Sequence, residues 1–169
     1  MNFQLTEEQA MIQKIVRDFA DKELMPMAAE LDEKEEFPHE ITKKMGEMGL
    51  FGLPFPEAYG GSGAGYLAYA IAVEEISRAC ASTGITYAAH CSIGTGPIYL
   101  FGTEEQKKKW VVPCAQGKMF ASFGLTEPNA GSDAGGTQTT AVLDGDEWVL
   151  NGSKCFITNV GVSKVAVIT

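Results

Sequence analysis

The sequence has 169 residues and a formal net charge of −9, since 13 lysines and arginines face 22 aspartates and glutamates. This balance argues against a general nucleic-acid-binding protein, because clustered basic side chains are needed to hold a phosphate backbone. Hydrophobic residues make up 45% of the chain, as in an ordinary globular protein. No apolar stretch approaches the roughly 20 residues that cross a bilayer, so no membrane span is expected.

The first residues and the cysteines indicate in which cellular compartment the protein is expected. Residues 1–6 lack a basic region followed by an apolar core, so no export signal is expected. Cys80, Cys91, Cys114 and Cys155 are widely spaced and form no CxxC pair. This spacing predicts reduced cysteines in a reducing compartment and no metal site. We therefore expect a cytoplasmic protein.

The first fifty residues predict three helices. The first begins with the capping-box spacing of Thr6 and Gln9, which satisfies free N–H groups at a helix start, and Pro26 interrupts it near its end. A short helical piece and a charged run, expected to be solvated, follow. Pro38 starts the third helix and Gly49 ends it. The apolar stripes are Met11, Ile12, Ile15, Val16 and Phe19, then Leu31, then Ile41, Met45 and Met48.

The middle of the chain predicts a loop and two more helices. Residues 50–65 are rich in glycine and proline and predict a long ordered loop. A phosphate-binding loop is rejected there, because neither the Walker spacing nor GxGxxG between a strand and a helix occurs. After the next helix, Ser82 or Thr83 is expected to cap an apolar helix at residues 85–93. Being apolar nearly all round, that helix should be buried.

Two features here could suggest chemistry. His90 lies alone on the apolar helix, where a histidine is more often simply hydrogen-bonded than catalytic. The basic run Lys107–Lys109 lies in a helix that begins with a second capping box at Thr103. Pro113 and Gly117 are expected to close that helix. The lysines predict a solvated helix face, and a contact to a phosphate group stays open as the alternative.

From Met119 onward, strand-forming residues replace the helical rhythm. Asp144-Gly145 separates two strand-like runs and predicts a hairpin. Further strands are expected at Cys155–Thr158 and Val165–Ile168. Because the last strand would leave an unpaired edge, we expect the chain to be part of a longer polypeptide.

These patterns predict an α+β chain with two domains. Residues 1–118 form an all-α domain, and residues 119–169 form the start of a β-barrel or β-sandwich domain. The boundary is expected near residue 118, where the helical pattern gives way to strands.

The stretch from Phe123 to Gly136 begins as an extended run and becomes polar and Gly-rich. Small residues let backbone amides approach a planar polar ring or a pyrophosphate closely. Thr126 and Ser132 add hydroxyl groups. This composition fits a ligand-binding edge, and it fits equally a hairpin or omega-type loop that closes a β element.

Two motifs then identify a resemblance. Gly124-Leu125-Thr126-Glu127, followed by Ala130-Gly131-Ser132-Asp133 and Gly136, is similar to the first signature of the acyl-CoA dehydrogenase family. Trp148-Val149-Leu150-Asn151-Gly152-Ser153-Lys154-Cys155-Phe156-Ile157-Thr158-Asn159 resembles the second flavin-contacting strand of that family. The resemblance covers essentially the whole chain, which is less than half of a usual member. The family's carboxy-terminal helical bundle is therefore expected to be absent from it.

The resemblance implies an FAD cofactor between the helical layer and the β domain. The cofactor-binding residues that it implies are Phe123, Gly124, Leu125, Thr126, Ser132, Phe156, Ile157 and Thr158. Backbone groups near Leu125 and the Thr126 hydroxyl would meet the flavin ring, and Phe156 would lie against its face. From the residues alone, core packing of Phe123 and ordinary turn hydroxyls at Ser132 and Thr158 stay open as alternatives.

The implied reaction is FAD-dependent α,β-dehydrogenation of an acyl-CoA thioester, with a preference for short chains. A carboxylate removes the α proton in such a reaction, and the resemblance places that glutamate beyond Thr169, so no residue here is assigned as catalytic. Glu127 and Asp133 would belong to the flavin loop, and Ser132 would also contact the substrate. The resemblance further implies an electron-transferring flavoprotein as acceptor and a homotetramer.

Two other functions stay open. In the first, the fold is the same but the reduced flavin meets oxygen, which gives an acyl-CoA oxidase or a flavin monooxygenase. In the second, the chain is a non-catalytic helical interaction module, which the missing base favours. A flavin chromophore would separate the enzymes from the module, and the rate of reoxidation in air would separate the enzymes from each other.

Overall fold

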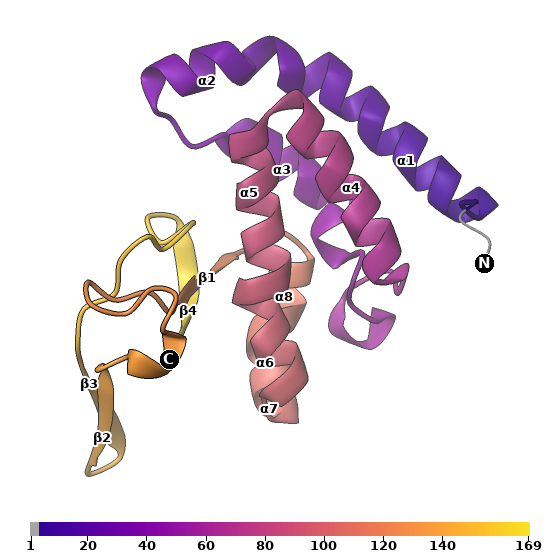
Figure 1. The fold of residues 1–169 in the computed structure, drawn as a ribbon. Coiled ribbons are helices and arrows are strands. Elements are labelled where there is room, and N and C mark those ends of the chain that lie inside the picture. Colours follow the sequence, from indigo (N-terminus) through magenta and orange to yellow (C-terminus); the bar gives the residue numbers. More distant parts are fainter. Residues whose placement is uncertain (1–3) are drawn as a thin grey trace.

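The computed structural model describes residues 4–169 and places helices before strands along the chain (Figure 1). The α-helices are α1 Glu7–Phe19, α2 Ala28–Lys34, α3 His39–Glu47, α4 Gly65–Ala79, α5 Ala81–Ala89, α6 Gly96–Phe101, α7 Glu104–Gln106 and α8 Val112–Ala115. The strands are β1 Phe120–Gly124, β2 Thr140–Asp144, β3 Glu147–Asn151 and β4 Ser163–Ile168. Short 3-10 turns lie at Met25–Met27, Leu50–Gly52, Glu57–Tyr59 and Ala134–Gly136. This order confirms the predicted fold class, a helical domain followed by the start of a sheet-containing domain.

Both predicted capping boxes are present. At the start of α1, Thr6 Oγ1 accepts a hydrogen bond from the Gln9 N–H at 3.2 Å, and the Gln9 side chain accepts from the Thr6 N–H at 3.0 Å. At the start of α7, Thr103 and Gln106 make the same reciprocal pair. Each box satisfies two N–H groups that a helix start leaves free. These helix starts are therefore fixed by residues only three positions apart.

Several helices of the described chain continue through π-helical turns, at Ala20–Leu24, His90–Thr95 and Lys107–Val111. Such a turn inserts one extra residue without ending the helical run. The helix that begins after Thr103 therefore reaches Ala115, and the expectation that Pro113 closes it is wrong. Pro113 lies in the first turn of α8, directly after the π-helical turn at Lys107–Val111.

The apolar helix α5 departs from its prediction in two ways. Neither Ser82 nor Thr83 caps it, and the Thr83 hydroxyl donates instead to Cys80 Sγ at 3.3 Å. Ile85 and Ile93 are 58% and 46% exposed. The reason is that α5 and the turn after it pack against α4 and β1 on one side and leave the other side open. An apolar sequence therefore does not bury this helix all round.

The main core lies between α1, α3, α4 and α5, and α1 packs beside α4 (Figure 1). Its buried members are Val16, Phe19, Leu24, Ile41, Met45, Leu50, Phe51, Leu53, Ala72, Ile76, Tyr87 and Cys91. The buried Tyr87 hydroxyl donates to the Leu50 carbonyl at 2.9 Å, so its one polar atom is satisfied. Met11, Ile15 and Met48 are exposed, so the stripes are narrower than predicted.

The charged surface segments follow their predictions with one exception. Residues 32–36 are all exposed, as expected for a solvated run. In the lysine run, Lys108 and Lys109 are exposed, but the Lys107 side chain is only 18% exposed. Its ammonium lies 5.9 Å from the ring centroids of Tyr59 and Tyr99, an attractive cation–π arrangement. Lys107 therefore packs on aromatic rings instead of facing solvent.

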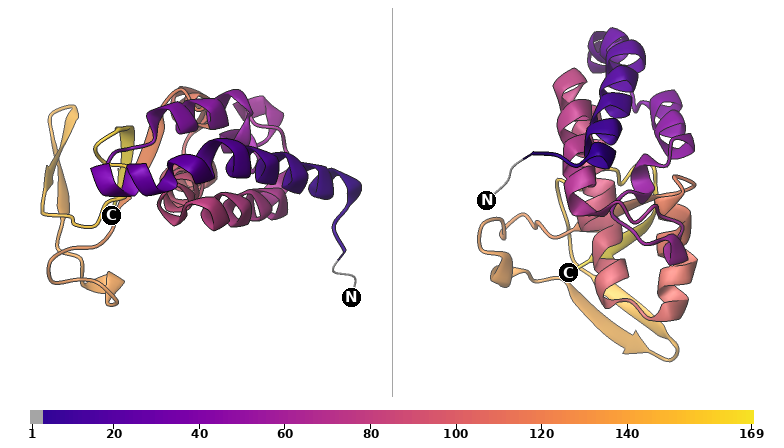
Figure 2. Two further views of the ribbon diagram at one scale, coloured as in Figure 1. Left: turned by 90° about the horizontal axis from the view of Figure 1, so that it is seen from above. Right: turned by 90° about the vertical axis from the view of Figure 1, so that its right-hand side faces the viewer.

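The strands form two separate pairs. β1 and β4 are parallel, with Gly124 opposite Ile168, a pairing that the sequence did not predict. β2 and β3 form the predicted hairpin, in which Asp144 lies opposite Glu147. Figure 1 and the left view of Figure 2 show the hairpin extending away from the helices, and every residue of both strands is exposed. Only the β1–β4 pair is therefore packed against the helical region.

Candidate functional site

The first motif segment, residues 123–136, meets the second motif segment, residues 148–159, at the end of β1. Gly124 is buried there. A Cβ atom at Gly124 would lie 3.4 Å from Cγ of Lys154 and 3.6 Å from Cδ1 of Ile157, and only 2.8 Å from Cδ1 of Ile168. Glycine therefore lets the second motif segment pack directly on the backbone of the first.

Backbone hydrogen bonds join the same two segments. The Cys155 N–H donates to the Thr126 carbonyl at 2.9 Å, and Cys155 Sγ lies 3.7 Å from the same oxygen. Next to it, Lys154 Nζ donates to the Leu125 carbonyl at 3.0 Å. The stretches around Thr126 and Cys155 are thus held side by side although they lie 29 positions apart in the chain.

The predicted strand at Cys155–Thr158 is wrong. Phe156 and Asn159 have φ angles of 57° and 68°, in the left-handed region, which a β-strand cannot accommodate. This backbone leaves the Phe156 ring 92% exposed. The segment is held instead by the Cys155–Thr126 hydrogen bond and by the Asn159 side-chain amide, which donates to the Thr86 carbonyl of α5 at 2.9 Å.

Hydrogen-bond donors are left free at this junction. The carbonyls of Leu125 and Thr126 both accept bonds from the second motif segment. Within residues 4–169, the N–H groups of Leu125 and Thr126 and the Thr126 hydroxyl have no hydrogen-bond partner. Backbone N–H groups on a loop with little side-chain bulk suit an electron-rich edge of a planar ligand. The junction therefore presents donors and keeps its acceptors occupied.

The Glu127 carboxylate joins three parts of the junction through hydrogen bonds. Its carboxylate accepts from the N–H of Gln138 at 2.7 Å, from the N–H and hydroxyl of Thr139 at 2.9 and 2.5 Å, and from Lys154 Nζ at 2.7 Å. The hydrogen bond from Lys154, followed by those from Thr139 and Gln138, lowers the pKa of Glu127 to about 2. A carboxylate with so low a pKa is a weak base at neutral pH. Glu127 is therefore suited to holding these segments together.

The other predicted site residues lie at different places around the junction. Phe123 is half-buried in β1, and Ile157 packs toward Gly124. Thr158 is half-buried in the turn that follows, and Ser132 is exposed in the first motif loop. No hydrogen bond within the described residues connects Ser132 or Thr158 to the junction. The structure therefore brings Gly124, Thr126 and Ile157 together and leaves the hydroxyls of Ser132 and Thr158 unengaged.

His90 is hydrogen-bonded, as the sequence interpretation expected. Its fully buried ring donates from Nε2 to the Cys114 carbonyl at 3.1 Å and accepts at Nδ1 from the Ala121 N–H at 3.0 Å. Burial lowers the pKa of His90 to about 4, so the ring is neutral at physiological pH. His90 therefore connects the end of α8 to β1 and lies away from any exposed ligand edge.

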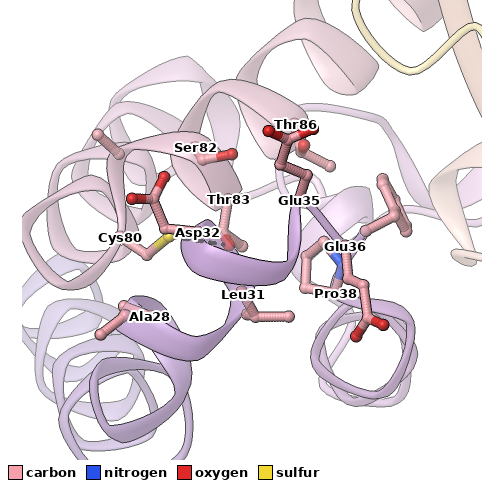
Figure 3. A pocket seen from close by; sticks show the side chains of 13 residues that line it. Ala28, Leu31, Asp32, Glu35, Glu36, Pro38, Cys80, Ser82, Thr83 and Thr86 are labelled. Atoms are coloured by element: carbon pink, nitrogen blue, oxygen red, sulfur yellow. Dashed lines mark hydrogen bonds between the residues drawn. The ribbon is translucent and has the colours of Figure 1, made fainter.

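A separate cavity of about 640 Å³ lies between α2 and the start of α5 (Figure 3). Neither motif segment lines it. Its rim carries Asp32, Glu35 and Glu36, and no lysine or arginine lines it. Carboxylates repel a phosphate-bearing ligand. We therefore place the candidate site at the junction of the motif segments and not in this cavity.

Three further observations describe the remaining sites that the sequence raised. Among residues 4–169, no group of three or more His, Cys, Asp or Glu side chains is placed to hold a metal ion. Cys80, Cys91, Cys114 and Cys155 are all free thiols in this part of the chain. None of the described helices combines the length and the apolar character that crossing a membrane requires.

Sequence reasoning assigned no role to Lys154, Cys155 or Thr139. For Lys154 a signal was available in the sequence. Lys154 is the one charged residue in the run Ser153–Thr158, and a buried lysine needs a carboxylate or another acceptor nearby. Glu127 lies in the other motif and has the opposite charge. No comparable signal marks Thr139, because its contact depends on how the loop after Glu127 returns.

Comparison with known proteins shows which family the chain belongs to. Residues 6–118 match the family model of the acyl-CoA dehydrogenase N-terminal domain, and residues 122–169 match that of the acyl-CoA dehydrogenase middle domain. The chain belongs to the acyl-CoA dehydrogenase family. It is 57% identical over its whole length to "Probable acyl-CoA dehydrogenase YngJ" of Bacillus subtilis, and 53% identical over 99% of its length to the short-chain specific acyl-CoA dehydrogenase of Clostridium acetobutylicum.

A solved structure within the acyl-CoA dehydrogenase family gives the same result. The acyl-CoA dehydrogenase of Bacillus anthracis complexed with FAD is 42% identical and superimposes with a TM-score of 0.92, covering 98% of this chain and 29% of that chain. The present chain spans 44% of the length of each of the two curated relatives. It thus corresponds to less than half of the length of each of these relatives.

Proposed function

We propose that this chain forms part of the FAD and substrate sites of a short-chain acyl-CoA dehydrogenase, which catalyses α,β-dehydrogenation of an acyl-CoA thioester. The observation that carries the proposal is the contact of the two motif segments at Gly124 and Thr126, which leaves backbone N–H donors free on one edge. The short-chain preference is supported by the relative from Clostridium acetobutylicum, and FAD by the Bacillus anthracis enzyme.

The proposed cofactor contacts are Phe123, Gly124, Leu125, Thr126, Ser132, Phe156, Ile157 and Thr158, with Ser132 also facing the substrate. The free N–H groups of Leu125 and Thr126 would donate to the polar edge of the flavin, which stabilises the charge that the ring gains on reduction. The exposed Phe156 ring is available to lie against the flavin face. FAD, when bound, supplies the acceptor for the hydride that leaves the β carbon.

We further propose that the catalytic base comes from outside residues 1–169. Glu127 is unsuited to that role, because all its hydrogen bonds serve the loop junction and its pKa is about 2. We also propose a division into two domains, residues 1–118 and 119–169, and a cytoplasmic location. We propose an electron-transferring flavoprotein as the electron acceptor and a homotetramer as the assembled form. The acceptor and the tetramer extend the family resemblance, whereas the domain boundary and the location come from the sequence patterns described above.

The test uses the complete polypeptide purified with its native cofactor. We expect a yellow protein whose flavin absorbance is bleached by butyryl-CoA without oxygen and restored by an electron-transferring flavoprotein. Stopped-flow mixing of the reduced protein with air should show slow reoxidation. Rapid formation of peroxide would instead identify an oxidase or monooxygenase. A colourless protein that takes up no FAD would contradict both and favour a non-catalytic interaction module.

A further inference from the structure

The ion pair between Glu127 of the first motif segment and Lys154 of the second is buried. Each side chain is 7% exposed, and their closest atoms lie 2.7 Å apart. By contrast, the surface pair of Lys44 and Glu23 has a similar separation of 2.6 Å, but its side chains are 47% and 46% exposed. Burial of two charges carries a desolvation cost that a simple surface contact avoids. The buried pair is therefore weak evidence for added stability, and its other contacts show what it holds in place.

Lys154 fixes the direction of one peptide group in the first motif segment. Its Nζ donates to the Leu125 carbonyl at 3.0 Å while it pairs with Glu127. The Leu125 carbonyl and the Thr126 N–H belong to the same trans peptide unit, so they point in opposite directions. A lysine that holds this carbonyl on one side therefore aims the free Thr126 N–H at the other side.

Glu127 in turn fixes Lys154 and the returning loop. Besides the lysine, its carboxylate accepts from Gln138 and Thr139, at the end of the loop that carries Ser132. The neighbouring Cys155 N–H occupies the Thr126 carbonyl. One buried pair thus holds both motif segments and the loop end in a single arrangement. A rotation of any of these parts would turn the Thr126 N–H away from its present direction.

We propose that Lys154, held by Glu127, is a positioning residue for the flavin-binding edge. It orients the 125–126 peptide so that the Thr126 N–H is presented to the ring, and it contacts neither cofactor nor substrate itself. This inference rests on the proposed FAD site. It adds a specific expectation, namely that Lys154, which does not contact the cofactor, controls both the affinity for FAD and the electron affinity of the bound flavin.

The test compares variants of the complete holoenzyme. In Lys154→Met, which retains the aliphatic length of the side chain but removes the ammonium, we expect the dissociation constant for FAD to rise about tenfold, as for the loss of one well-placed hydrogen bond. The flavin midpoint potential should become more negative, because a misdirected donor stabilises the reduced ring less. Lys154→Arg keeps the charge and should recover part of both losses. Lys44→Met, at the exposed surface pair, is the matched control and should change neither.

The outcomes separate positioning from simple stabilisation. If Lys154→Met lowers the melting temperature but leaves FAD affinity and potential at wild-type values, the positioning role is refuted. Should this variant fail to fold, Thr139→Val removes only one of the donors that orient Glu127. It should shift affinity and potential in the same direction by a smaller factor, and unchanged values would overturn the inference. A wild-type protein that binds no FAD would instead refute the proposed function.

Discussion

The neutral, buried His90 predicts a loss of stability in mildly acidic solution. The folded protein holds the ring between the Cys114 carbonyl and the Ala121 N–H, and Nδ1 must stay unprotonated to accept the second bond. Burial lowers the pKa of His90 from 6.5 to about 4. The unfolded chain takes up its proton near pH 6.5, whereas the folded chain resists until about pH 4. The contribution of His90 to stability should therefore fall as the pH drops from about 6.5 to about 4, and it should be constant below that.

The size of the effect follows from the same two values. The difference between the pKa of His90 in the unfolded chain, 6.5, and in the folded chain, about 4, corresponds to about 3 kcal/mol of folding free energy. At pH 5 the loss should already reach about 2 kcal/mol. This loss is a large part of the free energy of unfolding of a typical domain, which is about 5–15 kcal/mol. The effect should therefore be visible in an ordinary denaturation experiment.

The assay is urea unfolding of the complete polypeptide, followed by helical circular dichroism at several pH values between 7 and 5. We compare wild type with His90→Gln, which cannot be protonated in this range, and with His39→Gln at the exposed His39. Wild type and His39→Gln should lose stability toward pH 5, and His90→Gln should lose less by about 2 kcal/mol. Equal pH dependence in all three proteins would refute the reasoning, as would a pKa near 6.5 for His90 measured by NMR.

Three further predictions concern stability. Gly94→Ala should cost about 1–3 kcal/mol in urea unfolding, because its Cβ would lie 2.8 Å from the backbone of β1; Gly96→Ala, whose nearest neighbour is 3.6 Å away, is the control, and equal losses would contradict the steric argument. Glu75→Gln should lower stability by about 2 kcal/mol, because the 1% exposed carboxylate accepts two bonds from Arg17, and an unchanged urea midpoint would argue against this. Thr6→Ala should cost about 1 kcal/mol and speed hydrogen exchange in the first turn of α1, whereas unchanged exchange would dismiss the cap.

Features that depend on neighbouring residues were predictable from the sequence. The capping boxes at Thr6 and Thr103 join residues three positions apart, and the hairpin at Asp144-Gly145 is closed by adjacent strands. Their geometry is decided by local sterics and hydrogen bonding. The change from helices to strands follows from the same local preferences. The order of a helical region followed by strands could therefore be predicted before any contact was known.

Features that depend on distant residues were not predictable in the same way. The run at Cys155–Thr158 has strand-forming residues, but contacts with Thr126 and Thr86 hold it in a different shape. Thr86 and Asn159 are 73 positions apart, and no spacing rule connects them. The exposed faces at Ile85 and Ile93 likewise depend on where neighbouring elements pack.

For the candidate site, the sequence located the parts but not the way they fit together. The two motifs marked the segments that meet at Gly124, and the resemblance marked Thr126 and Ile157 within them. The role of Lys154 depends on the direction of a single peptide group, which only the folded backbone defines. Residue types and spacing carry no information about such directions.

The parallel pairing of β1 with β4 has a consequence for assembly. It fastens Gly124 next to Ile168, so the intervening chain, including both motif segments, becomes a closed loop. Closing a loop of this length costs conformational entropy, and the contacts that offset this cost form only when β1 and β4 pair. The β1–β4 pair therefore stabilises the junction at Gly124, whereas the β2–β3 hairpin can form locally. We therefore expect ligand binding at this junction to appear in one cooperative folding step. A deletion that removes β4 should abolish this binding.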